Sequence, residues 1–192
     1  MASTKEIEIA VAMAFARSGE VNRAQLILTD LAKNFSDDTL LNKYWIPSVR
    51  AAIALDQHRM DQAIQYLQTS APYELGGVTP PFSSGATLYP AYLRGLAYLE
   101  NQHWHEAAGE FQKILDHRGL VWNFPIGVLA RLQLARAHAR AGEINEARRL
   151  YQDFLSLFQD ANSDLTILHA AYSESAALND PTRKIKDSRL SN

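Results

Sequence analysis

The sequence predicts an all-α protein, a solenoid of about four helical hairpins that ends in a C-terminal capping helix. Two observations lead to this fold class. One spacing of small residues, a turn and large apolar residues recurs in four segments of the chain, and no proline lies in the middle of these segments. Because a single helical hairpin cannot bury its apolar face alone, the units are expected to stack on one another.

The recurring pattern has five positions. A small residue is followed by a second position three residues later, a turn four residues further on, an alanine five residues after the turn, and a large apolar residue four after the alanine. Small residues at a helix crossing let two backbones approach closely, and the larger residues fill the space beside them. The four sets are Ala12, Phe15, Gly19, Ala24 and Leu28; Ala51, Ala54, His58, Ala63 and Leu67; Gly95, Tyr98, Gln102, Ala107 and Phe111; and Ala135, His138, Gly142, Ala147 and Tyr151.

Each unit is expected to be a pair of antiparallel helices. The units are predicted at about residues 5–35, 44–70, 88–117 and 128–159. Pro47 and Pro90 lie just inside first helices, where a missing amide costs little. Asn22, Asp61 and Asn145 stand where second helices should begin, and all three are residue types that cap helix N-termini well.

The remaining segments connect or cap the units. Residues 71–88 form the longest insertion, and their prolines and glycines forbid a continuous helix. A second connector covers Asp116–Pro125, and residues 164–178 are predicted to be a capping helix over the last unit. We therefore expect one domain over residues 1–178, followed by a polar tail, 179–192, that is expected to be disordered.

The composition excludes several classes of function. The 192 residues carry a formal charge of −2, so there is no basic excess of the kind that nucleic-acid-binding domains use, and no nucleic-acid partner is expected. Cysteine is absent, which excludes disulfides, thiolate metal sites and cysteine nucleophiles and fits a cytoplasmic location. No run of about 18 apolar residues occurs, so no transmembrane segment is expected.

Two of the units resemble the tetratricopeptide repeat (TPR). In the third unit the similarity lies in Ala91-Tyr-Leu-Arg-Gly-Leu-Ala-Tyr-Leu99 and Trp104-His-Glu-Ala-Ala-Gly-Glu-Phe111, and in the fourth it covers residues 134–151. The first unit is similar as well, and the second departs from the pattern at Arg50 and His58, where the repeat usually has Leu and Gly. The resemblance implies a TPR-like superhelix that binds other proteins and has no catalytic residues, cofactor or metal of its own.

A narrower resemblance covers roughly residues 20–175. The segments 43–55, 71–75, 88–95, 110–119 and 151–155 resemble the C-terminal TPR region of acidobacterial serine/threonine protein kinases. The chain has no glycine-rich nucleotide loop, His-Arg-Asp catalytic loop or Asp-Phe-Gly motif, so kinase activity is not implied. What the resemblance implies is a regulatory or substrate-recruiting domain, separated here from its bacterial kinase domain.

The TPR resemblance also implies where a partner binds. In such arrays the first helices build the concave wall, and recurrent positions on them contact the ligand. Carried onto this sequence and reduced to the most prominent side chains, those positions are Trp45, Leu55, Tyr89, Tyr92, Leu96, Leu99, Arg136 and Arg140. An apolar, aromatic wall with arginines at one end suits an amphipathic helix or an extended apolar peptide with an acidic flank. Homo-oligomerisation, for example as a homodimer through an exposed end of the array, is the alternative of another class.

Three other features allow two interpretations each. His103 and His105 could chelate a metal on a strand or loop, but at a helical turn ordinary polarity is the expected explanation. Arg50 and Arg94 could bind an anionic group of a partner, but we expect both to pair with nearby carboxylates. The segment 74–88 could be a binding loop or a plain surface connector.

Overall fold

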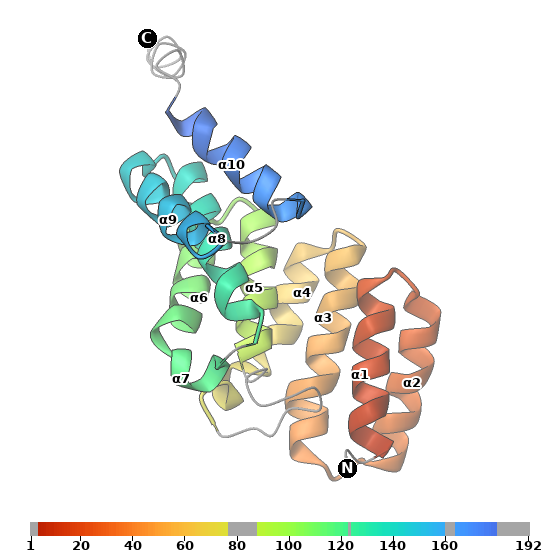
Figure 1. Ribbon diagram of the computed structural model, residues 1–192. Helices are drawn as coiled ribbons and strands as arrows, with labels where there is room; N and C mark the ends of the chain where they lie inside the picture. Colours follow the sequence, from red (N-terminus) through yellow and green to blue (C-terminus); the bar gives the residue numbers. More distant parts are fainter. Residues whose placement is uncertain (1–3, 77–87, 123, 160–163, 180–192) are drawn as a thin grey trace, which may run out of the picture.

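The computed structural model describes residues 4–76, 88–122, 124–159 and 164–179, and the described part is helical (Figure 1). The helices are α1 (Thr4–Arg17), α2 (Val21–Asn34), α3 (Ile46–Asp56), α4 (Met60–Gln68), α5 (Tyr89–Glu100), α6 (Trp104–Asp116), α7 (Arg118–Val121), α8 (Ile126–Arg140), α9 (Ile144–Ser156) and α10 (Thr166–Leu178). The predicted all-α, TPR-like helical repeat fold is confirmed. Apart from Asn179, the predicted polar tail lies outside the described residues, as does 77–87 of the long insertion.

Within the described residues, the hairpins α1–α2, α3–α4, α5–α6 and α8–α9 follow one another side by side (Figure 1). The first helices form one row, because α1 contacts α3, α3 contacts α5 and α5 contacts α8. Helix α10 packs on α9, as a capping helix should. None of the described helices is long and apolar enough to cross a membrane.

The turn inside each hairpin has one conformation throughout. The predicted turn residues Gly19, His58, Gln102 and Gly142 all have positive φ, between 55° and 81°. In each turn the next residue donates its N–H to a carbonyl five residues back, for example Glu20 to Phe15 at 2.9 Å and Glu143 to His138 at 2.9 Å. The repeat therefore needs a residue in the left-handed backbone conformation at this position, and glycine adopts that conformation without steric cost.

The prediction of side-chain caps on the second helices was wrong. Asn22, Asp61 and Asn145 are each the second residue of their helix, and the preceding N-cap positions make no side-chain cap hydrogen bond. The reason is the turn geometry. The backbone hydrogen bonds that close the left-handed turn begin the second helix one to two residues earlier than the cap pattern indicates.

The two non-glycine turns lead to a stability prediction. We expect His58→Gly and Gln102→Gly each to stabilise the fold by about 0.5–1 kcal/mol. Both side chains are exposed, and a residue other than glycine is strained in the left-handed backbone conformation. Urea unfolding followed by circular dichroism measures the change. The reverse substitution, Gly142→Ala, is expected to destabilise, and equal stability of all three variants and the parent chain would contradict the strain argument.

The core consists of two clusters of buried residues that meet at α5. Leu93 and Ala97 belong to the cluster that fills α1–α4, whereas Tyr92 and Leu99 belong to the cluster that fills α6–α10. Helix α5 is consequently buried on both sides, and it carries the close contact of Gly95 with the ring of Phe111. This helix connects the two halves of the array and also carries half of the predicted partner-binding residues.

The connectors contain short helical turns of their own. A π-helical turn, η1 (Leu41–Trp45), leads into α3, and a 3-10 turn, η2 (Ala71–Tyr73), opens the long insertion. Pro47 and Pro90 lie within the first turns of α3 and α5, as predicted. The second connector contains α7.

Candidate functional site

The side of the first helices that carries the predicted partner-binding residues is called the inner face below, and two of these residues are the aromatic side chains Tyr89 and Tyr92. Tyr89 and Tyr92, one helical turn apart on α5, stack with ring centroids 6.3 Å apart and an interplanar angle of 21°. Tyr92 also meets Phe111 edge-on at 5.9 Å. Burial raises the pKa of both tyrosines above the ordinary value, so their hydroxyls stay neutral and act as hydrogen-bonding groups. Tyr89 is half-buried and Tyr92 is buried, so Tyr89 offers more surface to a partner.

Two predicted leucines lie together at one end of this face. Leu55 on α3 and Leu96 on α5 line a hollow of about 270 Å³ between the C-terminal ends of α1, α3 and α5. Arg17, Asp56 and Glu100 line the same hollow. Its apolar lining, Leu55 and Leu96, is therefore surrounded by one positive and two negative side chains. Such a hollow can hold an apolar side chain whose backbone or neighbours make polar contacts at the rim.

Arg136 is held by the capping helix. Its Nε and Nη2 donate to the Glu174 carboxylate at 2.9 and 2.8 Å, and the Tyr151 hydroxyl donates to the same carboxylate at 2.8 Å. Burial alone would raise the pKa of Glu174, but the hydrogen bonds from Arg136 and Tyr151 outweigh it and lower the pKa. This bidentate pair fixes α10 to α8 and α9, and it occupies the guanidinium that was predicted to contact a partner.

Arg140 is the more accessible of the two predicted arginines. It is exposed in the last turn of α8, and its guanidinium lies over the Trp104 ring at 5.5 Å from the centroid. A cation–π contact of this kind positions the side chain while its N–H groups can still bind an acidic group. The basic end of the inner face therefore depends on Arg140.

The core includes four of the predicted residues: Trp45, Leu55, Tyr92 and Leu99. Trp45 is 4% exposed and packs edge-on against Tyr44 at 4.8 Å, and Leu99 is 6% exposed within the second core cluster. The structure thus brings Tyr89 and Tyr92 together, and separately Leu55 and Leu96. It places Trp45 and Leu99 where they stabilise the helices that carry this face.

Sequence reasoning missed Arg17. Its charge acts on both Tyr89 and Tyr92, where it lowers the pKa against the larger effect of burial. The side chain is exposed and lines the hollow beside Leu96. Helical periodicity could have found it, because Arg17 is one turn beyond Met13 on the same side of α1.

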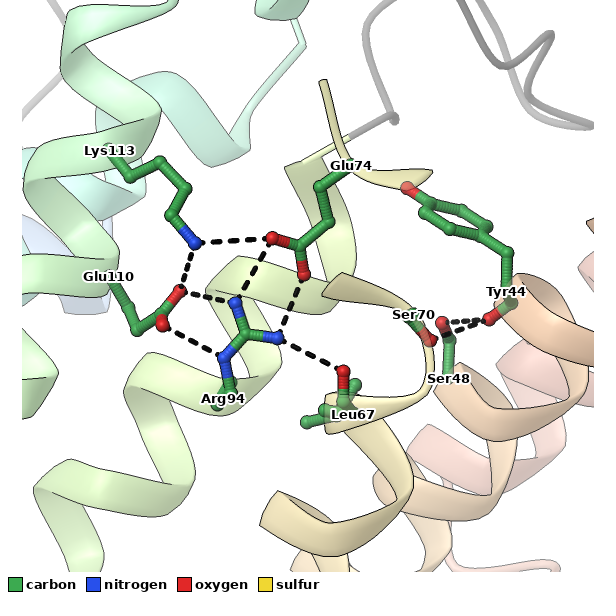
Figure 2. A network of polar contacts seen from close by, with 8 residues as sticks. All are labelled: Tyr44, Ser48, Leu67, Ser70, Glu74, Arg94, Glu110 and Lys113. Atoms are coloured by element: carbon green, nitrogen blue, oxygen red, sulfur yellow. Dashed lines mark hydrogen bonds and ion pairs between the residues drawn. The ribbon is translucent and has the colours of Figure 1, made fainter. Parts of the chain in front are cut away.

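A buried ionic network lies behind this face, between the second and third hairpins. Figure 2 shows the Arg94 guanidinium between the carboxylates of Glu74 and Glu110, with Lys113 beside both. Arg94 donates all five of its N–H groups: two to Glu74 at 2.9 and 3.0 Å, two to Glu110 at 2.6 and 2.8 Å, and one to the Leu67 carbonyl at 3.1 Å. Arg94 was expected to pair with nearby carboxylates, and this is confirmed.

The network is electrically balanced and buried. Glu74 is 1% exposed and Arg94 4% exposed, and Lys113 contacts Glu74 at 3.2 Å and Glu110 at 3.1 Å. Burial by itself would lower the pKa of Arg94, but the hydrogen bonds with Glu110 and Glu74 raise it above its ordinary value. Arg94 is consequently a structural group that joins α5 and α6 to the start of the long insertion, and no donor remains for a partner.

Arg50 does not follow the same prediction. It is exposed on α3 and lines a shallow hollow of about 260 Å³ together with Arg59 and Tyr66. Within the described part of the chain it has no carboxylate partner, so the expectation that it pairs was wrong. One reason is that the residue 16 positions after Arg50, which corresponds to Glu110 after Arg94, is Tyr66 and carries no charge.

His103 and His105, the two histidines of the possible metal site, have different neighbours. His103 stacks on Tyr98 at 6.0 Å, His117 meets the Lys113 carbonyl at 2.8 Å, and His105 lies 3.7 Å from Glu143, which also bonds His138. Among the residues that the structure describes, no group of three or more His, Asp or Glu is placed to hold a metal ion. These side chains make turn and helix-end contacts.

Comparison with known proteins adds one finding. The sequence pattern of the tetratricopeptide repeat matches residues 129–161, which comprise most of α8 and all of α9. No curated protein and no solved structure matched the chain. The similarity to kinase-associated repeats therefore stays a prediction, whereas the repeat match supports the TPR family and agrees with the helical-hairpin fold.

Proposed function

We propose that this TPR-like repeat protein is a non-catalytic interaction module that binds a peptide or helix of a partner protein along the inner face of its first helices. The match to the tetratricopeptide repeat indicates a protein–protein interaction module, and repeats of this family are generally non-catalytic scaffolds. The location of the site on this face and the nature of the partner segment are the proposal.

One observation carries the proposal. The half-buried side chains of Tyr89 and Leu96 form an apolar strip on α5, with exposed Arg17 on one side and exposed Arg140 on the other. Aromatic and arginine side chains dominate the binding energy of protein interfaces, and an apolar strip between cations fits an amphipathic segment with acidic flanks. Three predicted residues are not expected to touch the partner. Trp45 and Leu99 are packed in the core, and Arg136 is paired with Glu174.

The partner segment is expected to be acidic at its ends. Arg17 and Arg140 provide positive charge on both sides of the strip, whereas Asp56 and Glu100 lie at the rim of the hollow beside Leu55. A helix with apolar residues along one side would contact Tyr89 and Leu96, and carboxylates at its two ends would pair with Arg17 and Arg140. The kinase-associated role and homo-oligomerisation remain alternatives, for which no described contact provides specific support.

The test is a set of surface variants. Partners are captured from a lysate of the source organism with the wild-type chain, purified, and titrated against Leu96→Ala, Arg17→Glu and Arg140→Glu. Each substitution is expected to weaken binding by roughly tenfold or more, since each removes a contact of the strip or reverses its charge. Lys33→Glu on α2, exposed and away from this face, makes the same charge change and is expected to have no effect. If all four variants bind like the parent chain, the inner face is not the site.

A further inference from the structure

A third hollow lies apart from the two described above. It has a volume of about 480 Å³ and is bounded by the C-terminal end of α6, by α7, by the first turns of α8 and by Leu157 just after α9. Its floor is apolar, with Ile114, Val121 and Val128 among its lining residues. Among the described residues that line it, two are arginines, Arg118 and Arg131, and none is acidic.

The two arginines of this hollow are without carboxylate partners among the described residues, as Arg50 and Arg140 are. Arg94, Arg136 and Arg149, by contrast, each pair with carboxylates. Arg118 is exposed. The Nε of Arg131 is buried without a hydrogen-bond partner in the structure. Guanidinium N–H groups without a carboxylate partner favour anionic hydrogen-bond acceptors, so an acidic group suits the side of the hollow where these two arginines lie.

Trp122 adds an independent observation at the rim. Its backbone has φ 48° and ψ −129°, a conformation that side chains other than glycine rarely adopt, and it is 70% exposed. Burial of the indole therefore does not offset the strain. Leu157, on the opposite edge of the same hollow, is 53% exposed. Unlike the strained turns at His58 and Gln102, which belong to the repeat, Trp122 lies in a connector, and backbone strain of this kind occurs at ligand-binding sites.

The hollow is separate from the inner face. Arg131 and Arg140 are nine residues apart on α8, which places them about 180° apart around the helix axis. None of the residues that line this hollow is among those proposed to contact a partner on the inner face. A ligand here would leave the strip of Tyr89 and Leu96 free.

We propose that this hollow is a second binding site, which takes a partner peptide with one large apolar side chain next to one or more carboxylates. The volume is in the range of about 300–1,000 Å³ that specific ligand sites occupy. The apolar side chain enters the floor, the carboxylate receives hydrogen bonds from Arg118 and Arg131, and Trp122 and Leu157 cover the peptide from the two edges. Exposed apolar groups on both edges favour an extended chain over a compact small molecule, and the lining charge favours an acidic one.

The test uses synthetic peptides and the intact chain. Capped hexapeptides with a central Leu, Phe or Trp between glutamates are titrated by calorimetry and by NMR on isotope-labelled protein, beside the same peptides with lysines in place of the glutamates. The acidic peptides are expected to shift the resonances of residues 114–131 and to bind at least about tenfold more tightly than the lysine set. Equal binding of both sets, shifts confined to the inner face, or no binding of any acidic peptide would each overturn the proposal.

Variants separate this site from the inner face and from effects on folding. Arg118→Glu, whose side chain is exposed in the free chain, is expected to lose the acidic peptide, and Arg131→Glu is expected to lose it as well. Arg140→Glu, an equal charge change on the inner face, is expected to bind it normally. Trp122→Gly is expected to raise Tm by relieving the strained φ and at the same time to weaken peptide binding. Higher Tm with unchanged peptide binding would show that Trp122 has no part in the site.

Discussion

Replacing Arg94 by leucine is expected to destabilise the fold by about 3–5 kcal/mol. The substitution leaves Glu74, which is 1% exposed, in the interior with only Lys113 as a cationic partner, and it removes the five hydrogen bonds that Arg94 donates. The loss of stability comes from the buried Glu74 carboxylate, which is removed from water and no longer has its full set of hydrogen-bond donors. Guanidinium-chloride unfolding followed by circular dichroism measures it.

Arg149 provides the matched control. It also bridges two carboxylates, Glu146 and Asp153, but its side chain is 57% exposed. Arg149→Leu is therefore expected to cost less than about 1 kcal/mol, since exposed ion pairs contribute little.

A second control replaces Arg94 and both glutamates by apolar residues together, which should recover much of the stability because no buried charge is left unpaired. Equal effects of Arg94→Leu and Arg149→Leu would show that burial is not the cause.

The Arg94 network also fixes one end of the long insertion. Glu74 follows η2 and is held by α5 and α6 through Arg94 and Lys113 (Figure 2). In Arg94→Leu, hydrogen exchange in peptides that cover residues 70–76 is expected to increase beyond the increase seen elsewhere. Uniform acceleration along the chain would instead indicate a global effect.

Gly95→Ala is expected to destabilise the fold by about 1–3 kcal/mol, although alanine is the better helix former. A Cβ at this position would lie 2.6 Å from Cε1 and 2.8 Å from Cζ of Phe111, so the fully buried ring would have to shift within the core. The close approach of α5 and α6 depends on this missing side chain. Thermal and urea unfolding both report the loss.

Gly109→Ala is the control for Gly95→Ala. Gly109 is exposed in the middle of α6, and a Cβ there meets nothing within 4 Å. It is expected to stabilise by about 0.5–1 kcal/mol, because only the helix propensity changes. A double-mutant cycle with Phe111→Leu completes the test. If Phe111→Leu does not reduce the cost of Gly95→Ala, the steric explanation is wrong.

Much of the fold could be predicted from the sequence because the repeat depends on local and near-local constraints. A left-handed turn needs a residue such as Gly19 or Gly142, and a close helix crossing needs a small residue such as Gly95 at a fixed distance from that turn. These requirements recur at constant spacing, so they are visible in one sequence. The N-cap prediction failed because it depended on which of several hydrogen-bonding solutions closes the turn.

The candidate sites were less predictable. Repeat periodicity assigned Tyr89, Tyr92 and Trp45 equally to the partner-binding wall, whereas the structure leaves only Tyr89 of the three partly exposed. The hollow beside Trp122 has no repeat counterpart, since it depends on α7 in a connector between units. Its arginines are ordinary surface residues by their sequence context. Only the packing of four helices shows that they line one cavity.

By itself the sequence determined the helical hairpins, their turns and their order, since these follow from spacings within about 20 residues. Tertiary structure alone decided which arginines remain available. Arg94 is occupied by Glu74, 20 residues before it, and Arg136 by Glu174, 38 residues after it, whereas Arg140 remains exposed and Arg118 has no carboxylate partner among the described residues. The physical reason is that an ion pair depends on the spatial proximity of two side chains, and the stacking of one hairpin on the next sets that proximity.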